Sequence, residues 1–145
     1  MGANFINSCL EKIAKTFEVE AHDYIPFKND TTFPEVVLSI LSNAVPECLV
    51  RAEVYCPTTL LSTNEIDGAV FAKKFVRAVA IAKVEPRRAV THNKGIMNGV
   101  DALVLATGND FRAVEAGAHS YACKDGKYTS LTDAKVENGI FSFWI

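Results

Sequence analysis

Residues 93–123 read NKGIMNGVDALVLATGNDFRAVEAGAHSYAC, and this stretch carries the clearest helix signals of the chain. An apolar run ends at Gly108, a residue that commonly terminates helices because it adopts a left-handed backbone at low cost. Asn109 follows as the expected cap of a second helix. The pattern predicts two helices, over about residues 93–106 and 110–123, that meet at a short connection.

Two amphipathic helices are predicted ahead of this stretch. Apolar residues recur at helical spacing between residues 3 and 18, with charged residues on the other face. A similar pattern starts after Asp67, which has a side chain suited to capping, and Pro86 ends it. The segment from residue 19 to Pro34 is polar and mixed, and we expect a loop there.

Short strands complete the predicted fold. Residues 35–42 are rich in β-branched side chains, and residues 48–56 alternate between apolar and polar. At the carboxyl end, Asn138-Gly139 separates two strand-like runs, which predicts a hairpin with a tight primed turn. We therefore expect an α+β fold in which helices pack with short mixed strands.

Composition and charge exclude several classes of function. The 145 residues are 49% hydrophobic and 22% charged, as expected for one globular domain with a core. The net charge of -2 and the lack of a Lys/Arg cluster argue against nucleic-acid binding. No apolar run is long enough for a membrane span, and the amino end does not resemble a signal peptide, so we expect a cytoplasmic protein.

The cysteines and histidines do not form a metal-binding pattern. Cys9, Cys48, Cys56 and Cys123 contain no CxxC pair, and the three histidines are not grouped around them. We expect reduced thiols packed as small apolar side chains, and no metal site.

The polar stretch Thr91–Gly99 is the first candidate site. It places five polar side chains and two glycines ahead of an apolar run. Gly95 and Gly99 share one helical face, where the missing side chains would let a ligand or another backbone approach. Lys94 and Asn98 share the next face. An ordinary polar helix start with a surface lysine explains the same residues equally well.

A second polar centre, residues 108–112, opens the following helix. Asp110 could fold back towards Lys94 and form a charged pair that stabilises a developing oxyanion. An aspartate that simply caps its helix is the alternative. The small residues between Ala113 and Ala118 predict a closely packed, buried central helix, and His119 is expected to be a partly buried structural histidine.

Long blocks of the sequence resemble one enzyme family. Residues 88–99, RAVTHNKGIMNG, and residues 106–119, ATGNDFRAVEAGAH, resemble the two catalytic segments of soluble, class II hydroxymethylglutaryl-coenzyme A reductases. Residues 1–4, MGAN, resemble the end of the family's cofactor motif, and residues 40–43 resemble the strand that closes its small cofactor domain. The order and spacing match over nearly the whole chain.

The resemblance implies a role for each matching residue. Lys94 would be the catalytic lysine, and Asp110 the aspartate that bonds to it. Asn98 would support this network at the substrate, and Arg88 would hold the free carboxylate of the substrate. Met1, Gly2, Ala3, Asn4 and Asn43 would bind NADH or NADPH, the first four at a helix start that favours phosphate.

The resemblance also implies the reaction and the partners. Hydroxymethylglutaryl-CoA would be reduced by two hydride transfers to mevalonate and coenzyme A, in isoprenoid biosynthesis by default. Residues 1–43 would end the small NAD(P)-binding domain, and residues 44–145 would belong to the large substrate-binding domain. A homodimer with its active site at the subunit interface is expected.

Departures from the family pattern lead to two further expectations. Both ends of the chain look cut, and the family's catalytic glutamate and its thiolate-protonating histidine have no counterpart between Met1 and Ile145. We therefore expect the 145 residues alone to be catalytically weak or inactive. The alternatives are an inactive fragment or paralogue that only binds ligand or dimerises, and a different nicotinamide or coenzyme A enzyme, which no GxGxxG motif supports.

Overall fold

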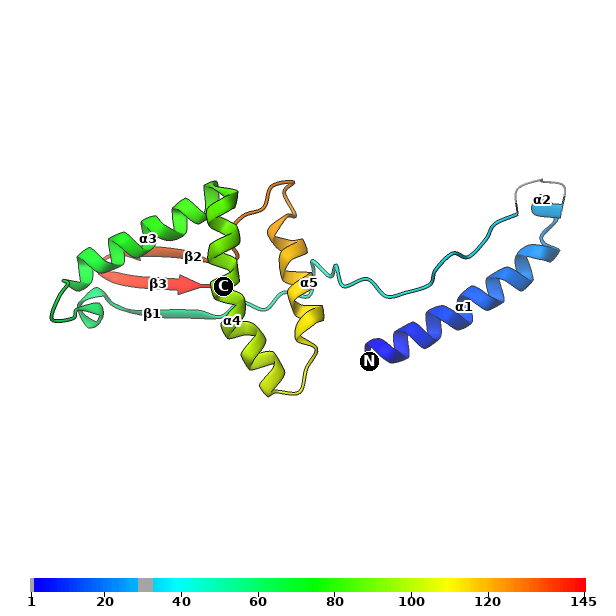
Figure 1. The fold of residues 1–145 in the computed structure, drawn as a ribbon, viewed down its shortest axis with the longest axis horizontal. Coiled ribbons are helices and arrows are strands. Elements are labelled where there is room, and N and C mark those ends of the chain that lie inside the picture. The colour runs from blue at the N-terminus through cyan, green and yellow to red at the C-terminus, as the bar shows by residue number, and fades with distance from the viewer. Residues whose placement is uncertain (1, 29–32) are drawn as a thin grey trace. The chain divides into compact units, whose positions relative to one another are not determined.

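The computed structural model describes residues 2–28 and 33–145 (Figure 1). The chain divides into two compact units, Met1–Ser42 and Asn43–Ile145. This division falls one residue from the domain boundary expected at residue 43. The role of each unit in a cofactor domain or a substrate domain stays a prediction.

The first unit is built on one long helix. Helix α1 spans Ala3–Asp23, which confirms the predicted helix and extends it by five residues. The short helix α2, Ile25–Lys28, lies where a loop was expected. The strand predicted for residues 35–42 is absent: the Leu41 N–H donates to Oδ1 of Asn7 at 2.8 Å instead of to a neighbouring strand. β-branched residues favour a strand only where a partner strand is available.

The second unit contains a three-stranded antiparallel sheet. Strands β1 (Glu53–Pro57), β2 (Asp133–Glu137) and β3 (Ile140–Trp144) lie in the order β1-β3-β2. The hairpin between β2 and β3 is confirmed, because Asn138 and Gly139 take the positive φ angles of 50° and 76° that a primed turn needs. The strand predicted from residue 48 begins only at Glu53.

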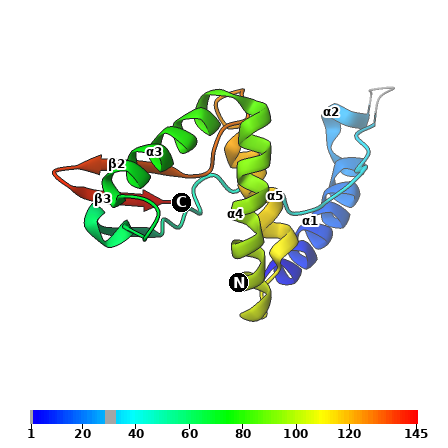
Figure 2. The same cartoon turned by 60° about the vertical axis from the view of Figure 1, so that its left-hand side comes forward.

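Helix α3 covers this sheet and forms the core with it (Figure 2). It spans Gly68–Val84 and begins, as predicted, at the N-cap Asp67. A short 3-10 helix, η1 (Thr58–Leu61), packs against its start. The core contains buried residues of α3, β2 and β3, namely Ala72, Val79, Ala134 and Phe141. Phe75 of α3 meets the rings of Phe141 and Phe143 edge to face, with both centroid distances 5.3 Å.

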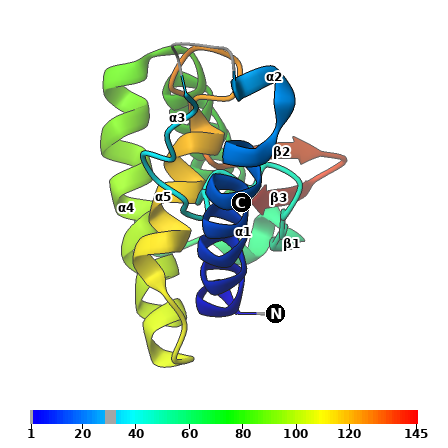
Figure 3. The ribbon, with the colours of Figure 1, turned by 90° about the vertical axis from the view of Figure 1, so that its right-hand side faces the viewer.

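Helices α4 and α5 lie side by side and run in opposite directions (Figure 3). Helix α4 spans Pro86–Ala106, so it starts seven residues earlier than predicted. Pro86 ends α3 and also occupies the first turn of α4, where a missing N–H costs nothing. Helix α5 spans Phe111–Ala122, and its N-cap is Asp110, so the expectation of Asn109 as the cap was wrong.

The connection between α4 and α5 is a tight helix-stopping turn. Gly108 has the left-handed φ of 72°. The Gly108 N–H donates to the Leu105 carbonyl and the Asn109 N–H to the Val104 carbonyl, each at 3.0 Å. These two bonds define a Schellman motif, which satisfies carbonyl groups that the end of α4 leaves unpaired. The predicted role of Gly108 is confirmed.

Three of the four cysteines depart from the expected packing. Cys9, Cys48 and Cys123 are exposed and Cys56 is half-buried, and all four are free thiols. Among residues 2–28 and 33–145, no three His, Cys, Asp or Glu side chains are grouped closely enough to hold a metal ion. Nor does any helix in those ranges combine the length and apolar character that crossing a bilayer requires.

Candidate functional site

The polar stretch of residues 91–99 forms the middle of α4 rather than the start of the helix predicted from about residue 93. Lys94 and Asn98 are one turn apart and both are exposed. Asp101 follows at seven residues from Lys94, so the same stripe of α4 carries an ammonium, an amide and a carboxyl group. The structure therefore brings Lys94 and Asn98 together on one face.

A neighbouring face of α4, about 100° around the helix from Lys94, is fixed by buried polar contacts. Asn93 is fully buried, and its Nδ2 donates to the Thr129 carbonyl at 2.9 Å. Its Oδ1 accepts the Leu131 N–H at 2.9 Å, so one amide binds two backbone groups of the loop before β2. These contacts set the rotation of α4, because turning the helix would break both. Lys94, the next residue, is thereby directed outward.

His92 adds a second anchor to the same loop. Its Nε2 lies 2.6 Å from Oγ1 of Thr132, a residue that is itself 2% exposed. Burial lowers the pKa of His92, because a charged imidazolium loses water contacts there. The imidazole is therefore a structural group that favours its neutral form.

Asp110 does not meet Lys94 within one chain. It caps α5, where its Oδ1 accepts the Ala113 N–H at 3.1 Å, and it is exposed. The Schellman turn just before Asp110 is hydrogen-bonded to the carbonyl of Val104. Val104 lies ten residues after Lys94, which is about 15 Å along the helix axis. This distance exceeds the combined reach of the two side chains. The expected folding back of Asp110 within the chain is therefore wrong.

The remaining predicted substrate residue, Arg88, lies in the first turn of α4 and is exposed. Gly95 and Gly99 are exposed on α4, and a Cβ added at either would meet no atom within 4 Å. They therefore do not serve a close approach inside this chain. They leave open space beside Lys94 and Asn98.

The predicted cofactor residues are divided between the two units. Gly2, Ala3 and Asn4 start α1 and are exposed, whereas Met1 lies outside the described residues. Gly2 gives no side-chain cap, and the first turn of α1 contains no acidic residue that would repel a phosphate. Asn43 is exposed and begins the second unit, where a Cβ on Gly117 of α5 would lie 3.3 Å from its carbonyl oxygen.

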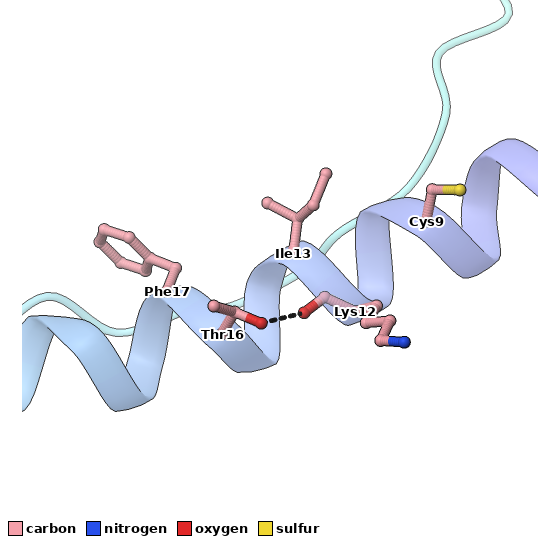
Figure 4. A pocket seen from close by; sticks show the side chains of 5 residues that line it. All are labelled: Cys9, Lys12, Ile13, Thr16 and Phe17. Carbon is pink, nitrogen blue, oxygen red and sulfur yellow. Dashed lines mark hydrogen bonds between the residues drawn. The ribbon is translucent and has the colours of Figure 1, made fainter.

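An apolar hollow runs along α1 (Figure 4). Cys9, Ile13 and Phe17 project to one side of the helix, and Thr16 donates to the Lys12 carbonyl at 3.0 Å. None of the residues that line it was predicted to bind substrate or cofactor. It is the exposed apolar stripe of an amphipathic helix, and we assign no site to it.

Helix α5 is less buried than its small residues predicted. Only Ala122 is fully buried, and Ala116 is exposed, so α5 is a surface helix within this unit. His119 is also exposed, and its Nδ1 lies 2.9 Å from the Tyr128 hydroxyl. The expectation of a buried central helix is wrong for these residues.

The sequence reasoning missed two features of α4. Asn93 recurs with Ala89 and Met97 at four-residue spacing, and all three are buried, so periodicity could have placed it on the inner face. Asp101 and Glu115 lie seven residues on either side of Gly108. A tight turn at Gly108 sets them opposite each other on antiparallel helices, which is the signal that could have paired them.

Comparison with known proteins shows the family. The model of the family hydroxymethylglutaryl-coenzyme A reductase matches residues 1–145. A 3-hydroxy-3-methylglutaryl-coenzyme A reductase of Archaeoglobus fulgidus is 42% identical over 137 residues, which cover 94% of this chain and 28% of the relative. A probable reductase of Borreliella burgdorferi is 39% identical over 132 residues, covering 91% of this chain and 28% of the relative.

Solved structures agree with the sequence comparison. The 3-hydroxy-3-methylglutaryl-coenzyme A reductase of Streptococcus pneumoniae matches with a TM-score of 0.81 and 35% identity, over 100% of this chain and 37% of the solved chain. A structure of the class II enzyme from the same organism, bound to NADPH in open conformations, matches equally well. The chain thus spans less than two fifths of the relatives it matches. It belongs to the hydroxymethylglutaryl-coenzyme A reductase family.

Proposed function

We propose that this chain carries the catalytic lysine segment of a class II hydroxymethylglutaryl-CoA reductase, which reduces hydroxymethylglutaryl-CoA to mevalonate and coenzyme A. The observation that carries this proposal is the exposed stripe of Lys94 and Asn98, with two open glycine positions beside it. An exposed ammonium with free space next to it can approach a carbonyl oxygen of a bound substrate.

In this proposal Lys94 stabilises the oxyanion that develops when the thioester carbonyl is reduced, and again at the aldehyde stage. Its position supports the role, because the buried Asn93 anchors the adjacent backbone and limits how far the Lys94 Cα can shift. Asn98, one turn further, is placed to orient the ammonium or the substrate hydroxyl. Arg88 offers a planar cation for the free carboxylate of the substrate.

Asp110 enters the site from a second subunit. Within one chain it follows the turn that binds Val104, about 15 Å along α4 from Lys94 by the helical rise. If the pair acts together, a partner copy must supply one of the two residues. We therefore infer a homodimer with the active site at the subunit interface, and the exposure of both side chains is consistent with this.

The amino end of α1 supports dinucleotide binding. NADPH or NADH would supply the hydride in each reduction. The N–H groups of Ala3 and Asn4 point out of the helix start, where the helix dipole favours phosphate oxygens. Gly2 leaves open space, since no atom lies within 4 Å of a Cβ built there. We choose NADPH as the first cofactor to test, because one solved relative binds it.

Several parts of the proposal come from the family resemblance. These are the assignment of the first unit to a small cofactor domain, the binding role of Met1 and Asn43, the place in isoprenoid biosynthesis, and the cytoplasmic location. The test of the reaction itself is oxidation of NADPH and NADH that depends on hydroxymethylglutaryl-CoA, measured with the chain in its complete reading frame. A folded protein without such oxidation would support the alternative of an inactive binding or dimerisation module.

A further inference from the structure

Two carboxyl groups meet across the hairpin of α4 and α5. Asp101 of α4 and Glu115 of α5 are both half-buried, and they lie on packed antiparallel helices, each seven residues from the turn at Gly108. Both belong to the two helices that the turn at Gly108 joins. The proposed reaction gives neither residue a role.

The hydrogen-bonding pattern around Asp101 is incomplete if both groups are ionised. Among the half-buried and buried residues that the structure describes, Asp101 Oδ1 is the one inaccessible side-chain oxygen or nitrogen without a hydrogen-bond partner. An ionised carboxylate can only accept hydrogen bonds, so an ionised Glu115 offers Asp101 no donor. A single proton between the two groups supplies a donor and removes one of two neighbouring negative charges.

The surrounding charges do not cancel this effect. Arg112 and His119, on the same helix as Glu115, favour its ionised form. The hydrogen bond and the charge repulsion from Asp101 are the larger influences, so they raise the pKa of Glu115 above its ordinary value, and burial adds to the rise. His119 is also engaged with the Tyr128 hydroxyl, which lies 2.9 Å from its Nδ1.

We propose that Asp101 and Glu115 share one proton and form a proton-dependent clasp that holds α5 against α4. When the proton leaves, two carboxylates face each other at the packed side of the hairpin, and the contact becomes repulsive. The first turns of α5 then pack less tightly against α4. Asp110 caps α5, so the position of its side chain depends on whether the clasp is protonated.

The sign of the pH dependence follows from the direction of the pKa shift. The folded chain holds the Glu115 proton more tightly than the unfolded chain does. The contribution to stability is therefore complete below the ordinary glutamate pKa and is lost as the pH rises through the elevated folded value. The clasp closes in acid and opens as the pH rises past the elevated pKa of Glu115.

Carboxyl ¹³C NMR of the 145-residue chain tests the clasp directly. We expect the Glu115 carbon to titrate with a midpoint above that of exposed glutamates. In the Asp101→Asn variant the Glu115 midpoint moves down, because an amide donor replaces a competing anion. Glu65→Gln, which removes an exposed carboxylate before α3, leaves the Glu115 signal unchanged. A Glu115 midpoint equal to that of exposed glutamates in the parent chain would overturn the proposal, even if no variant folds.

Hydrogen exchange provides the structural readout. We expect the amides of α5 to lose protection, relative to those of α3, as the pH rises through the Glu115 midpoint. Glu115→Gln keeps a hydrogen-bond donor at every pH, so α5 protection in this variant should not change across that range. Equal protection of α5 in the protonated and deprotonated parent chain would show that the proton does not hold the hairpin together.

Discussion

Asn93 binds the backbone of Leu131 through its side chain: Oδ1 accepts the Leu131 N–H at 2.9 Å while Nδ2 donates to Thr129 in the same loop. The fully buried amide of Asn93 thus connects α4 to the segment that leads into β2 through two hydrogen bonds to the backbone of that segment. Such a contact fixes the helix rotation next to Lys94.

Asn93→Ala should lower the free energy of unfolding by about 2–3 kcal/mol, because it leaves the N–H of Leu131 and the carbonyl of Thr129, both half-buried residues, without these partners. Urea unfolding of the 145-residue chain measures this. Asn98→Ala is the matched control on the same helix: its side chain is exposed, so the change should stay within about 0.5 kcal/mol. Equal effects of the two substitutions would refute the role of Asn93 as an anchor.

Two glycines should respond to alanine in opposite directions. At Gly68 a Cβ would lie 1.9 Å from the Thr58 carbonyl oxygen and 2.9 Å from the Ser62 nitrogen, so Gly68→Ala forces backbone apart and should cost about 1–3 kcal/mol. At Gly95 the space is open, and Gly95→Ala should stabilise α4 by about 0.5–1 kcal/mol. Chemical denaturation of both variants checks the signs. In the complete protein, Gly95→Ala should lower activity, because a methyl group would occupy the space beside Lys94.

The N-cap residue Asp67 stabilises the start of α3 through hydrogen bonds to the backbone. The N–H groups of Ala69 and Val70 donate to Asp67 Oδ1 at 2.9 and 3.1 Å. Asp67→Ala should therefore cost about 1 kcal/mol, whereas Asp67→Ser, which keeps an acceptor, should cost less. A difference in thermal midpoint between the two variants measures the cap. If both variants unfold at the same temperature, the hydrogen bonds to Asp67 do not stabilise the helix.

His92 gives the chain a second pH dependence, opposite in sign to that of the Asp101–Glu115 clasp. Burial lowers its pKa from the ordinary 6.5, so the unfolded chain binds the proton more tightly. Stability is complete above the ordinary value and is lost as the pH falls from there through the depressed folded value. His92→Gln keeps a polar partner for Thr132 without a titrating group, so it should remove this loss. Thermal unfolding above and below pH 6.5 compares the two chains, and an identical slope in both would contradict the prediction.

Local signals in the sequence predicted those parts of the fold that depend on neighbouring residues. Asp67 and Pro86 bound α3 because capping and the missing proline N–H act within one turn. Gly108 ends α4, and Asn138-Gly139 forms the hairpin turn, because both sites need positive φ angles.

Long-range contacts could not be predicted in the same way. The β-branched residues 35–42 form no strand, because Asn7, more than thirty residues away, binds this segment through its side chain. The motif around Lys94 was recognised, and the predicted helix of residues 93–106 already separated Lys94 from Asp110; the start of α4 at Pro86, seven residues earlier, was not predicted. The pairing of Asp101 with Glu115 emerges only once the two helices are set antiparallel.

The most direct test of the central claim compares the parent protein with Lys94→Ala, both in the complete reading frame, in an assay of NADPH oxidation that depends on hydroxymethylglutaryl-CoA. Lys74→Ala, at an exposed lysine of α3, is the control for loss of a surface charge. We expect Lys94→Ala to lower turnover by about 100-fold or more, the usual effect of removing a group that stabilises an oxyanion. Lys74→Ala should stay within about twofold of the parent, as most substitutions at exposed sites do. Turnover of folded Lys94→Ala equal to that of the parent, or a folded parent without such oxidation, would contradict the assignment of Lys94 as the catalytic lysine of a reductase.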